Sequence, residues 1–475
     1  MACCWIAARC SLSILRHTAR AKLKCGAYDY AIGSEFVNYT EINAMARQII
    51  PFLALTSVLG GCTVTSGRLD PTYELASERV RPGITVLLRD SMELIRGKKI
   101  GLLTNQTGVN ERRDSDIDLL RGDAAKKANV NLTVLFSPEH GIRGTEDREG
   151  IANTVDSKTG LPIISLYGKE TTAPPDSEMR KIDALVFDLQ DIGTRTWTYV
   201  GAMIYSMRAA ARTGKTIIVL DRPNPITGYY VEGPVLDSAL ANPDDPTPAK
   251  PGQAYALYPV PLRHGMTMGE MALMFNDVLN IRANLKVVPM RGWRRELWFD
   301  RTGLPWVRPS PNMPSLQSAM LYPGLVAFEG SNLSVGRGTP TAFQIVGAPW
   351  LKADEVVKML KDREMRGVRF VAEKFTPKDP TDSKFANQQI NGIRILITNR
   401  GSMQPSRVGA ALLWAINKTS PNDLKLNDRA FDLRFGAPRI REALLRGEDP
   451  DAVIDKEYRA AYEFREKTRR FLLYQ

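Results

Sequence analysis

Four short runs of apolar residues shape the first half of the chain, and each run ends abruptly in polar residues with glycine or proline. A continuous apolar run of about five residues is typical of a strand that is buried on both faces of its sheet. We therefore predict four buried strands, at residues 98–104, 132–136, 183–188 and 216–220.

Helical patterns lie between some of these runs. Residues 114–129 can form one helix, and residues 198–213 place apolar side chains at helical spacing before Gly214, a typical helix stop. Strands that alternate with helices favour a parallel α/β sheet with right-handed crossovers. Such sheets bind ligands beyond the carboxyl ends of their strands, which is where the polar residues after each run would gather.

The composition changes at residues 237–262, which are rich in proline, aspartate and alanine. We interpret this stretch as a surface loop and the start of a second lobe. Beyond it, the pattern predicts helices at 267–279, 353–363 and 407–416, strands at 285–290, 368–375 and 392–398, and a helical C-terminal end. We expect a Rossmann-like first lobe at 76–250 and a second α/β lobe at 251–475. No glycine fingerprint follows the first strand, so no nucleotide cofactor is expected.

Charge and composition narrow the class of protein. Of 475 residues, 43% are hydrophobic and 24% are charged, as in an ordinary soluble globular protein, and the formal net charge is +12. The basic residues are spread along the chain without a dense Lys/Arg block. We therefore expect a mild attraction to anionic polymers or surfaces and no binding of nucleic acid.

All five cysteines lie at or before Cys62. The rest of the chain therefore has no disulfide, zinc–thiolate site or cysteine nucleophile.

The segment at residues 45–62 resembles a bacterial lipoprotein signal. Arg47 precedes a short apolar run, and the run ends in Leu-Gly-Gly before Cys62, which would carry the lipid. The alternative is a buried N-terminal helix. On the lipoprotein interpretation, residues 1–44 are an extension from a start codon placed too far upstream, residues 63–75 are a tether, and the protein is anchored to a membrane of the cell envelope, facing the periplasm.

Glu139 is the first candidate for chemistry, because it follows a predicted strand and stands beside His140, one of only three histidines. A carboxylic acid near apolar neighbours such as Phe136 can act as a general acid. The alternative is a turn carboxylate bonded to backbone amides. His140 and His264 could together bind a metal ion with a carboxylate, but they lack the usual ligand spacing, so we expect no metal.

Polar residues also follow the other predicted strands. Asp188, Gln190 and Asp191 form one such group, and a carboxylate there would supply the second member of a glycosidase pair. Alternatively, Asp191 caps a helix that begins near Thr194. Asp221 and Arg222 either form an ion pair or contact a substrate.

In the second lobe, compact polar loops contain Glu329, Asn332 and Arg337, of which the arginine can grip a carboxylate. These loops can equally be plain turns. Trp293, Trp298 and Trp306 could stack on sugars, although packing in a core is the commoner role of tryptophan.

Eight ordered motifs in this chain together resemble one family, the exo-β-N-acetylmuramidases of the NamZ type. The motifs are LTNQTG (103–108), FSPEHG (136–141), DLQDIG (188–193), DRPNP (221–225), GPVLD (233–237), LRHGMT (262–267), PSPNMP (309–314) and FEGSN (328–332). The resemblance implies a Rossmann-like lobe without a nucleotide, a second α/β lobe, and an active-site cleft between them. It also implies release of terminal N-acetylmuramic acid (MurNAc) from the non-reducing end of peptidoglycan fragments, without a cofactor.

The resemblance also suggests roles for single residues. Glu139 would protonate the glycosidic oxygen, and His140 would orient Glu139 or balance its charge. Asp188 or Asp191 would be nucleophile or base, unless the substrate's own N-acetyl group attacks. Arg143, Arg195 or Arg337 would pair with the lactyl carboxylate of MurNAc. Further substrate contacts are expected from Asn105, Gln106, Gln190, Asp221, Arg222, His264, Glu329 and Asn332.

Two other functions are compatible with the same residues. One is a lipid-tethered protein that binds muropeptides or sugars without cleaving them. The other is a metal-dependent envelope hydrolase that uses His140, His264 and an aspartate.

Overall fold

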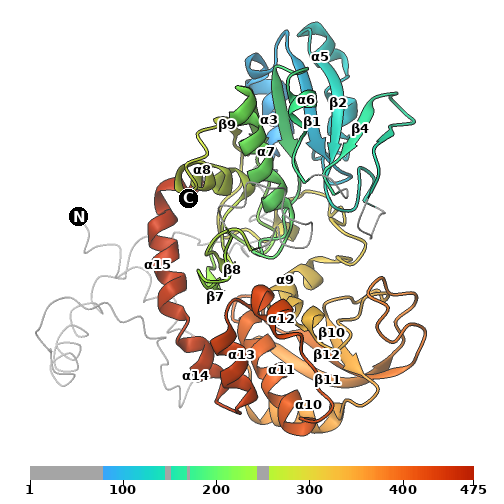
Figure 1. The fold of residues 1–475 in the computed structure, drawn as a ribbon, viewed down its shortest axis with the longest axis vertical. Helices are drawn as coiled ribbons and strands as arrows, with labels where there is room; N and C mark the ends of the chain where they lie inside the picture. The colour runs from blue at the N-terminus through green and yellow to red at the C-terminus, as the bar shows by residue number, and fades with distance from the viewer. Residues whose placement is uncertain (1–78, 145–150, 168–171, 243–255) are drawn as a thin grey trace, which may run out of the picture. The chain divides into compact units, whose positions relative to one another are not determined.

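A seven-stranded, mostly parallel sheet organises the first lobe of the protein (Figure 1). The structure is a computed structural model that describes residues 79–144, 151–167, 172–242 and 256–475. The strand order is β3-β4-β2-β1-β5-β6-β9, and only β3 is antiparallel to its neighbour. The strands are β1 (Lys99–Thr104), β2 (Asn131–Ser137), β3 (Thr154–Val155), β4 (Pro162–Ser165), β5 (Ala184–Asp188), β6 (Thr216–Leu220) and β9 (Asn284–Val288). The four predicted strands are therefore confirmed as β1, β2, β5 and β6. The predicted extension, signal with Cys62, and tether lie outside the described residues.

Alternate side chains of the central strands enter two different apolar clusters. Leu102 and Val186 pack on one face of the sheet, whereas Leu103 and Phe187 pack on the other. Both faces are covered by helices: α3 (Gly83–Asp90), α4 (Asp116–Leu119), α5 (Asp123–Lys127), α6 (Asp176–Met179), α7 (Tyr199–Thr213) and α8 (Met268–Val278). This double burial explains why the strands are continuous apolar runs without alternation.

The predicted helix at 114–129 is wrong as a single element. It is split into α4 and α5 because Gly122 is extended and precedes the first residue of α5. Helix α7 ends as predicted at Gly214, whose φ of 67° lies in the left-handed region that glycine tolerates best.

The second lobe is built on a three-stranded antiparallel sheet in the order β10-β12-β11. Its strands are β10 (Ile345–Ala348), β11 (Val368–Phe375) and β12 (Ile390–Ile397), and its helices are α9 (Leu316–Leu325), α10 (Ala353–Asp362), α11 (Pro405–Thr419), α12 (Asp428–Phe435), α13 (Pro438–Leu445) and α14 (Pro450–Asp455). One apolar cluster continues from the first lobe into this one, through residues such as Leu325 and Phe328.

The expected lobe boundary at 250/251 is wrong. The strand predicted at 285–290 is β9, which pairs in parallel with β6, and α8 packs beside it. The first sheet therefore extends past residue 280, and the elements of the second lobe begin with α9. The described residues also form four 3-10 helices: η3 (Met92–Leu94), η5 (Phe299–Arg301), η6 (Val326–Gly330) and η7 (Arg469–Phe471).

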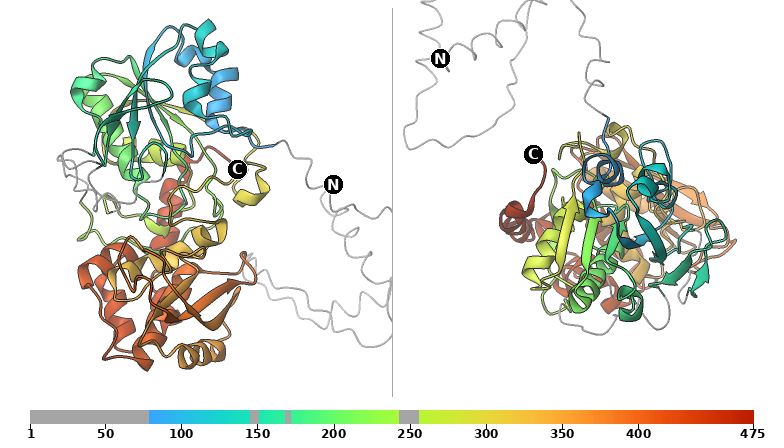
Figure 2. Two further views of the ribbon diagram at one scale, coloured as in Figure 1. Left: turned by 90° about the vertical axis from the view of Figure 1, so that its right-hand side faces the viewer. Right: turned by 90° about the horizontal axis from the view of Figure 1, so that it is seen from above.

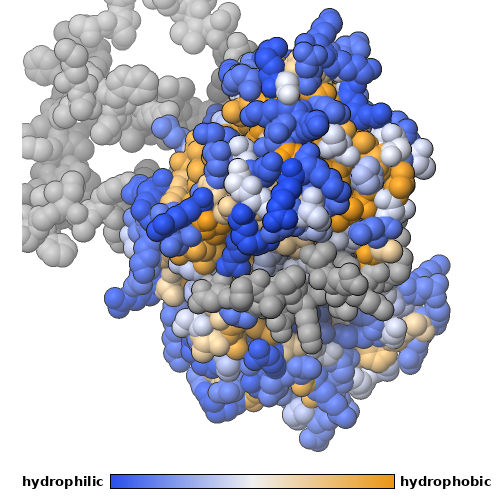
Figure 3. Space-filling model, turned by 45° about the horizontal axis from the view of Figure 1, so that its top comes forward, coloured by the Kyte–Doolittle hydropathy of each residue, from blue (hydrophilic) through white to orange (hydrophobic). Residues whose placement is uncertain are grey.

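The strands β7 (Glu232–Val235) and β8 (Pro261–Arg263) form a small antiparallel pair. The last helix, α15 (Tyr458–Thr468), packs on this pair and runs back from the second lobe to α8 (Figures 1 and 2). None of the described helices has the length and hydrophobicity needed to cross a membrane. On the face shown in Figure 3, apolar residues form separate patches among hydrophilic ones.

Candidate active site

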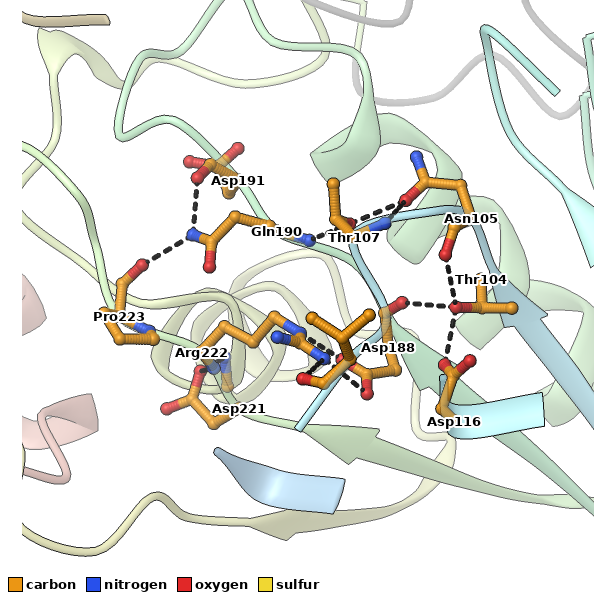
Figure 4. Close-up of polar contacts among 12 residues, drawn as sticks. Thr104, Asn105, Thr107, Asp116, Asp188, Gln190, Asp191, Asp221, Arg222 and Pro223 are labelled. Carbon is orange, nitrogen blue, oxygen red and sulfur yellow. Dashed lines mark hydrogen bonds and ion pairs between the residues drawn. The ribbon is translucent and has the colours of Figure 1, made fainter. Parts of the chain in front are cut away.

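Polar side chains gather at the carboxyl ends of β1, β5 and β6, as the sequence predicts (Figure 4). Thr104 ends β1 and Asp188 ends β5, and these two residues are register partners in the sheet. Asp221 and Arg222 follow β6 directly. Parallel strands therefore bring residues that are far apart in the sequence to one edge.

Asp188 and Arg222 form a buried ion pair. The Arg222 Nη2 atom lies 2.9 Å from Asp188 Oδ2, its Nε donates to Oδ1, and the two side chains are 4% and 0% exposed for the arginine and the aspartate. Arg222 also donates to the backbone oxygen of Val109. Burial raises the pKa of Asp188, and the charge of Arg222 opposes this rise. The prediction of an ion pair between Asp221 and Arg222 is wrong, because the Arg222 guanidinium pairs with Asp188 instead.

Asp116 is a buried carboxyl group that the sequence analysis did not identify. Thr104 Oγ1 lies 2.6 Å from Asp116 Oδ2 and 3.1 Å from the backbone oxygen of Asp188. Burial raises the pKa of Asp116 well above its ordinary value, and the Asp188 carboxylate raises it further. The threonine hydroxyl donates to the Asp116 carboxyl, which gives this buried oxygen a partner.

Asp221 is surrounded by donors at the end of β6. Its Oδ1 accepts from the backbone amides of Arg222 and Gly269, at 2.9 and 2.8 Å. Its Oδ2 accepts from Thr267 Oγ1 at 2.7 Å and from Tyr474 Oη at 2.6 Å. Burial raises the pKa of Asp221 to about 7. Both oxygens are thus engaged by protein groups, which is the arrangement of a structural carboxyl.

Asn105 and Gln106 connect β1 to the segment that precedes the second lobe. Asn105 Nδ2 donates to Tyr199 Oη at 2.8 Å, and Tyr199 Oη donates to the backbone oxygen of Pro309 at 2.6 Å. Gln106 Nε2 donates to the backbone oxygen of Arg308 at 2.7 Å. These contacts fix the PSPNMP motif at the strand ends.

Asp191 and His264 approach each other in the interior. His264 Nδ1 accepts from the Met266 amide at 3.1 Å, so its proton is on Nε2, which lies 3.6 Å from Asp191 Oδ2. The same Oδ2 accepts from the Gly193 amide at 2.5 Å, whereas the buried Oδ1 has no partner within the described chain. Asp191 does not cap a helix, since α7 begins only at Tyr199.

Gln190 shares this loop with Asp191 (Figure 4). Its Nε2 donates to the backbone oxygens of Asp191 and Pro223, both at 2.8 Å. Its backbone amide donates to Thr107 Oγ1 at 3.0 Å. Gln190 therefore ties the loop after β5 to the loops after β6 and β1.

Glu139 differs from these groups because it is only half-buried. Its Oε2 accepts from Thr198 Oγ1 at 2.5 Å, and it lines a cavity of about 20 Å³ together with Thr198, Tyr199 and Tyr205. Next to it, His140 is buried and has a φ of 71°, so the chain turns sharply there. The predicted neighbours Glu139 and His140 thus lie in a tight turn after β2.

Tyr199 connects Glu139 electrostatically with Asp191. Burial raises the pKa of the tyrosine hydroxyl well above its ordinary value, and the Glu139 and Asp191 carboxylates both raise it further, against the hydrogen bond from Asn105. Thr198 and Tyr199 were predicted only as part of a helix. Their position beside the strand ends, in the string RTWTY, was the signal that could have identified them.

The three candidate arginines have different surroundings. Arg195 is buried and donates to the backbone oxygens of Leu433 and Arg434 in α12, at 3.0 and 2.8 Å. Arg337 holds Glu329, with its Nη2 2.5 Å from Oε1. Arg143 pairs with the buried Asp156 at 2.5 Å, but its own side chain is 55% exposed.

The second-lobe candidates take part in contacts within the protein. Burial of Glu329 would raise its pKa, but Arg337 and Arg434 outweigh it and hold the pKa below its ordinary value. Asn332 Nδ2 donates to the backbone oxygen of Asp423, and its Oδ1 accepts from the Lys425 amide, at 2.8 and 3.0 Å. These loops fit the alternative interpretation as turns.

Trp293 and Trp298 are buried in the apolar clusters, as is common for tryptophan. Over the described ranges, no three His, Cys, Asp or Glu side chains are grouped as metal ligands would be.

The family model described as "Exo-beta-N-acetylmuramidase NamZ, N-terminal" matches residues 100–317, and the corresponding C-terminal model matches residues 320–474. A Bacillus subtilis (strain 168) protein, "Peptidoglycan beta-N-acetylmuramidase NamZ", is 37% identical over 433 residues, which cover 90% of this chain and 100% of the relative.

Two crystal structures of DUF1343 family proteins from Bacteroides fragilis share the fold. One has a TM-score of 0.73 and 33% identity, and the match covers 84% of this chain and 99% of the other. The second has a TM-score of 0.62 and 29% identity, with 83% and 99% covered.

Proposed function

Because this chain belongs to the NamZ family of exo-β-N-acetylmuramidases, we propose that it is a glycoside hydrolase that releases terminal MurNAc from peptidoglycan fragments. The reaction takes place at the strand ends around Glu139. It contributes to peptidoglycan turnover.

One observation carries the assignment of Glu139. Among the strand-end carboxylates discussed above, Glu139 is half-buried and accepts from one hydroxyl group, Thr198, whereas Asp188 and Asp221 are saturated by protein donors. A general acid needs a proton that it can transfer to the substrate, and a carboxyl that is enclosed by an arginine cannot offer one. Glu139 is the group that can reach a ligand.

In the proposed reaction, Glu139 gives its proton to the glycosidic oxygen as the bond between that oxygen and C1 of MurNAc breaks. Water then adds its hydroxyl to C1 and returns a proton to the carboxylate. Asp191 is the second carboxylate, because its Oδ1 has no partner in the described chain, unlike the oxygens of Asp188 and Asp221, while the Gly193 amide donates to its Oδ2. It either acts on C1 or orients the N-acetyl group of the substrate.

Arg143 binds the lactyl carboxylate of MurNAc. It lies four residues after Glu139, and more than half of its side chain is exposed while Asp156 fixes its position. Arg195 and Arg337 instead stabilise the protein, through the backbone of α12 and through Glu329.

The test uses soluble protein that starts near Thr65, incubated with the MurNAc–GlcNAc disaccharide and analysed by mass spectrometry. Wild-type protein should release free MurNAc, and Glu139→Gln should lose at least about a hundredfold in rate. Asp188→Asn is the matched control for removing a carboxylate, analysed only in its folded fraction, and it should lose far less. Intact disaccharide with folded wild-type protein would refute the proposal and favour a muropeptide-binding protein.

We also propose that Cys62 is lipidated and anchors the enzyme in the cell envelope, on the periplasmic side. The support is the sequence at 45–62. Mass analysis of the membrane-extracted protein should find a diacylated Cys62 at the mature N-terminus. A stable product that retains residues 1–44 would contradict this.

A further inference from the structure

Helix α15 exposes two tyrosine rings on its surface. Tyr458 and Tyr462 are 71% and 52% exposed, although large apolar side chains are mostly buried elsewhere in the described chain. The ring centroids are 6.4 Å apart and the ring planes differ by 20°. Residues four apart lie on one face of a helix, so the rings form an aromatic platform along α15.

The same face continues to Arg465 and a cavity of about 360 Å³. Arg465 lines this cavity, and its guanidinium carbon lies 5.9 Å from the ring of Tyr229, another exposed aromatic at 55%. The other walls come from the loops at 228–231 and 264–266, from Arg295, and from the chain at 466–475. Glu466, the one acidic side chain among these walls, is paired with Arg469. This volume is within the range of small-ligand pockets.

Arg465 is distinguished from the other cations near it by its lack of a carboxylate partner. Over the described residues, no Asp or Glu oxygen lies within 4 Å of Arg465, whereas the other basic side chains of this region have acidic partners. These paired residues are Arg295, Arg459, Lys467, Arg469 and Arg470. An unpaired guanidinium in a pocket, beside aromatic rings, is complementary to a carboxylate on a ring-shaped ligand.

We propose that Tyr458, Tyr462 and Arg465 form an accessory site that binds a short carboxylated amino-sugar chain. Sugar rings stack on the tyrosines, and a lactyl carboxylate enters the cavity at Arg465. From residue 458 to residue 465 the helix rises roughly 10 Å, which accommodates two pyranose rings. The choice of glycan rests on the proposed function, while Tyr458, Tyr462 and Arg465 are none of the groups placed around Glu139; His264 lines the far wall of the cavity. Such a site would hold the enzyme on an anionic glycan chain.

The test measures binding to Glu139→Gln protein, which does not consume the ligand. Calorimetric titration with a peptide-free tetrasaccharide of alternating GlcNAc and MurNAc should show two binding events. Adding Arg465→Gln should weaken one of them at least tenfold, and Arg465→Lys should restore part of the affinity. The double substitution Tyr458→Ala/Tyr462→Ala should weaken the same event. Arg459→Gln, on the same helix, is the matched control and should change nothing.

Other outcomes would overturn the proposal. A single binding event, or two events that Arg465→Gln leaves unchanged, would do so. So would binding only of ligands that carry stem peptides, or a dimer in light scattering that Tyr458→Ala dissociates. A separate activity assay tests the proposed function. In it, Arg465→Gln with Glu139 intact should cleave the disaccharide normally but release less MurNAc from insoluble peptidoglycan. Failure of wild-type turnover with intact two-site binding would refute the hydrolase alone.

Discussion

Asp188 ends β5 and Glu139 follows β2, the two strands on either side of β1, yet their surroundings are opposite. Asp188 is fully buried and held by both prongs of Arg222, whereas Glu139 is half-buried and accepts from one hydroxyl group beside a small cavity. A polar residue at a strand end can therefore build the edge of the sheet or face a ligand. Which of these two roles a carboxylate has depends on the hydrogen-bond partners of its oxygens, and the strand pattern does not predict it.

The largest effect that we expect comes from breaking the buried pair. Arg222→Met should lower the free energy of unfolding by about 3–5 kcal/mol, because it leaves Asp188 buried without its counter-charge. Urea denaturation would measure this. Arg459→Met, which removes an exposed arginine on α15, should cost well under about 1 kcal/mol. An unchanged stability of Arg222→Met would show that Asp188 is solvated and open to substrate.

The buried carboxyl Asp221 should give a pH dependence of stability. Its pKa is about 7 when folded and about 4 in an unfolded chain, so the folded state holds more protons between these values. The free energy of unfolding should therefore fall as pH rises from about 4 to 7, by up to about 4 kcal/mol, and level off above.

Asp221→Asn should flatten that part of the profile, as measured by denaturant midpoints at several pH values. The exposed Asp362→Asn is the control and should leave the profile unchanged. Glu232, whose pKa burial also raises to about 7, adds a parallel slope that both variants retain. If Asp221→Asn followed the wild-type slope, Asp221 would be ionised in the folded protein throughout.

The smallest effect concerns the support of Glu139. Thr198→Val removes the hydroxyl that donates to Oε2, so the carboxyl should lose its fixed orientation and kcat on the disaccharide should fall roughly tenfold. Thr213→Val, at the other end of α7, removes a hydroxyl that donates only within the helix and is the control. Equal activity of the two variants would mean that Thr198 does not position Glu139.

The sequence predicts much of the first lobe because its strands are unmistakable apolar runs, and because parallel strands must deliver their ends to one edge. It does not predict that Arg222 pairs with Asp188 and not with its sequence neighbour Asp221, since this pairing depends on side chains that only the folded sheet brings together. The place of β9 was missed for a similar reason. An edge strand with alternating burial looks the same in either lobe until its pairing with β6 is known.

The hydrogen bond from Tyr474 to Asp221 has a consequence for biosynthesis. The strands around Asp221 leave the ribosome long before Tyr474 does, so a nascent first lobe can form its sheet while this carboxyl still lacks one donor. Completion of that lobe requires a residue that is translated 253 positions later. Chains that terminate before Tyr474 should therefore be sensitive to proteolysis, even when every strand of the large sheet has been translated.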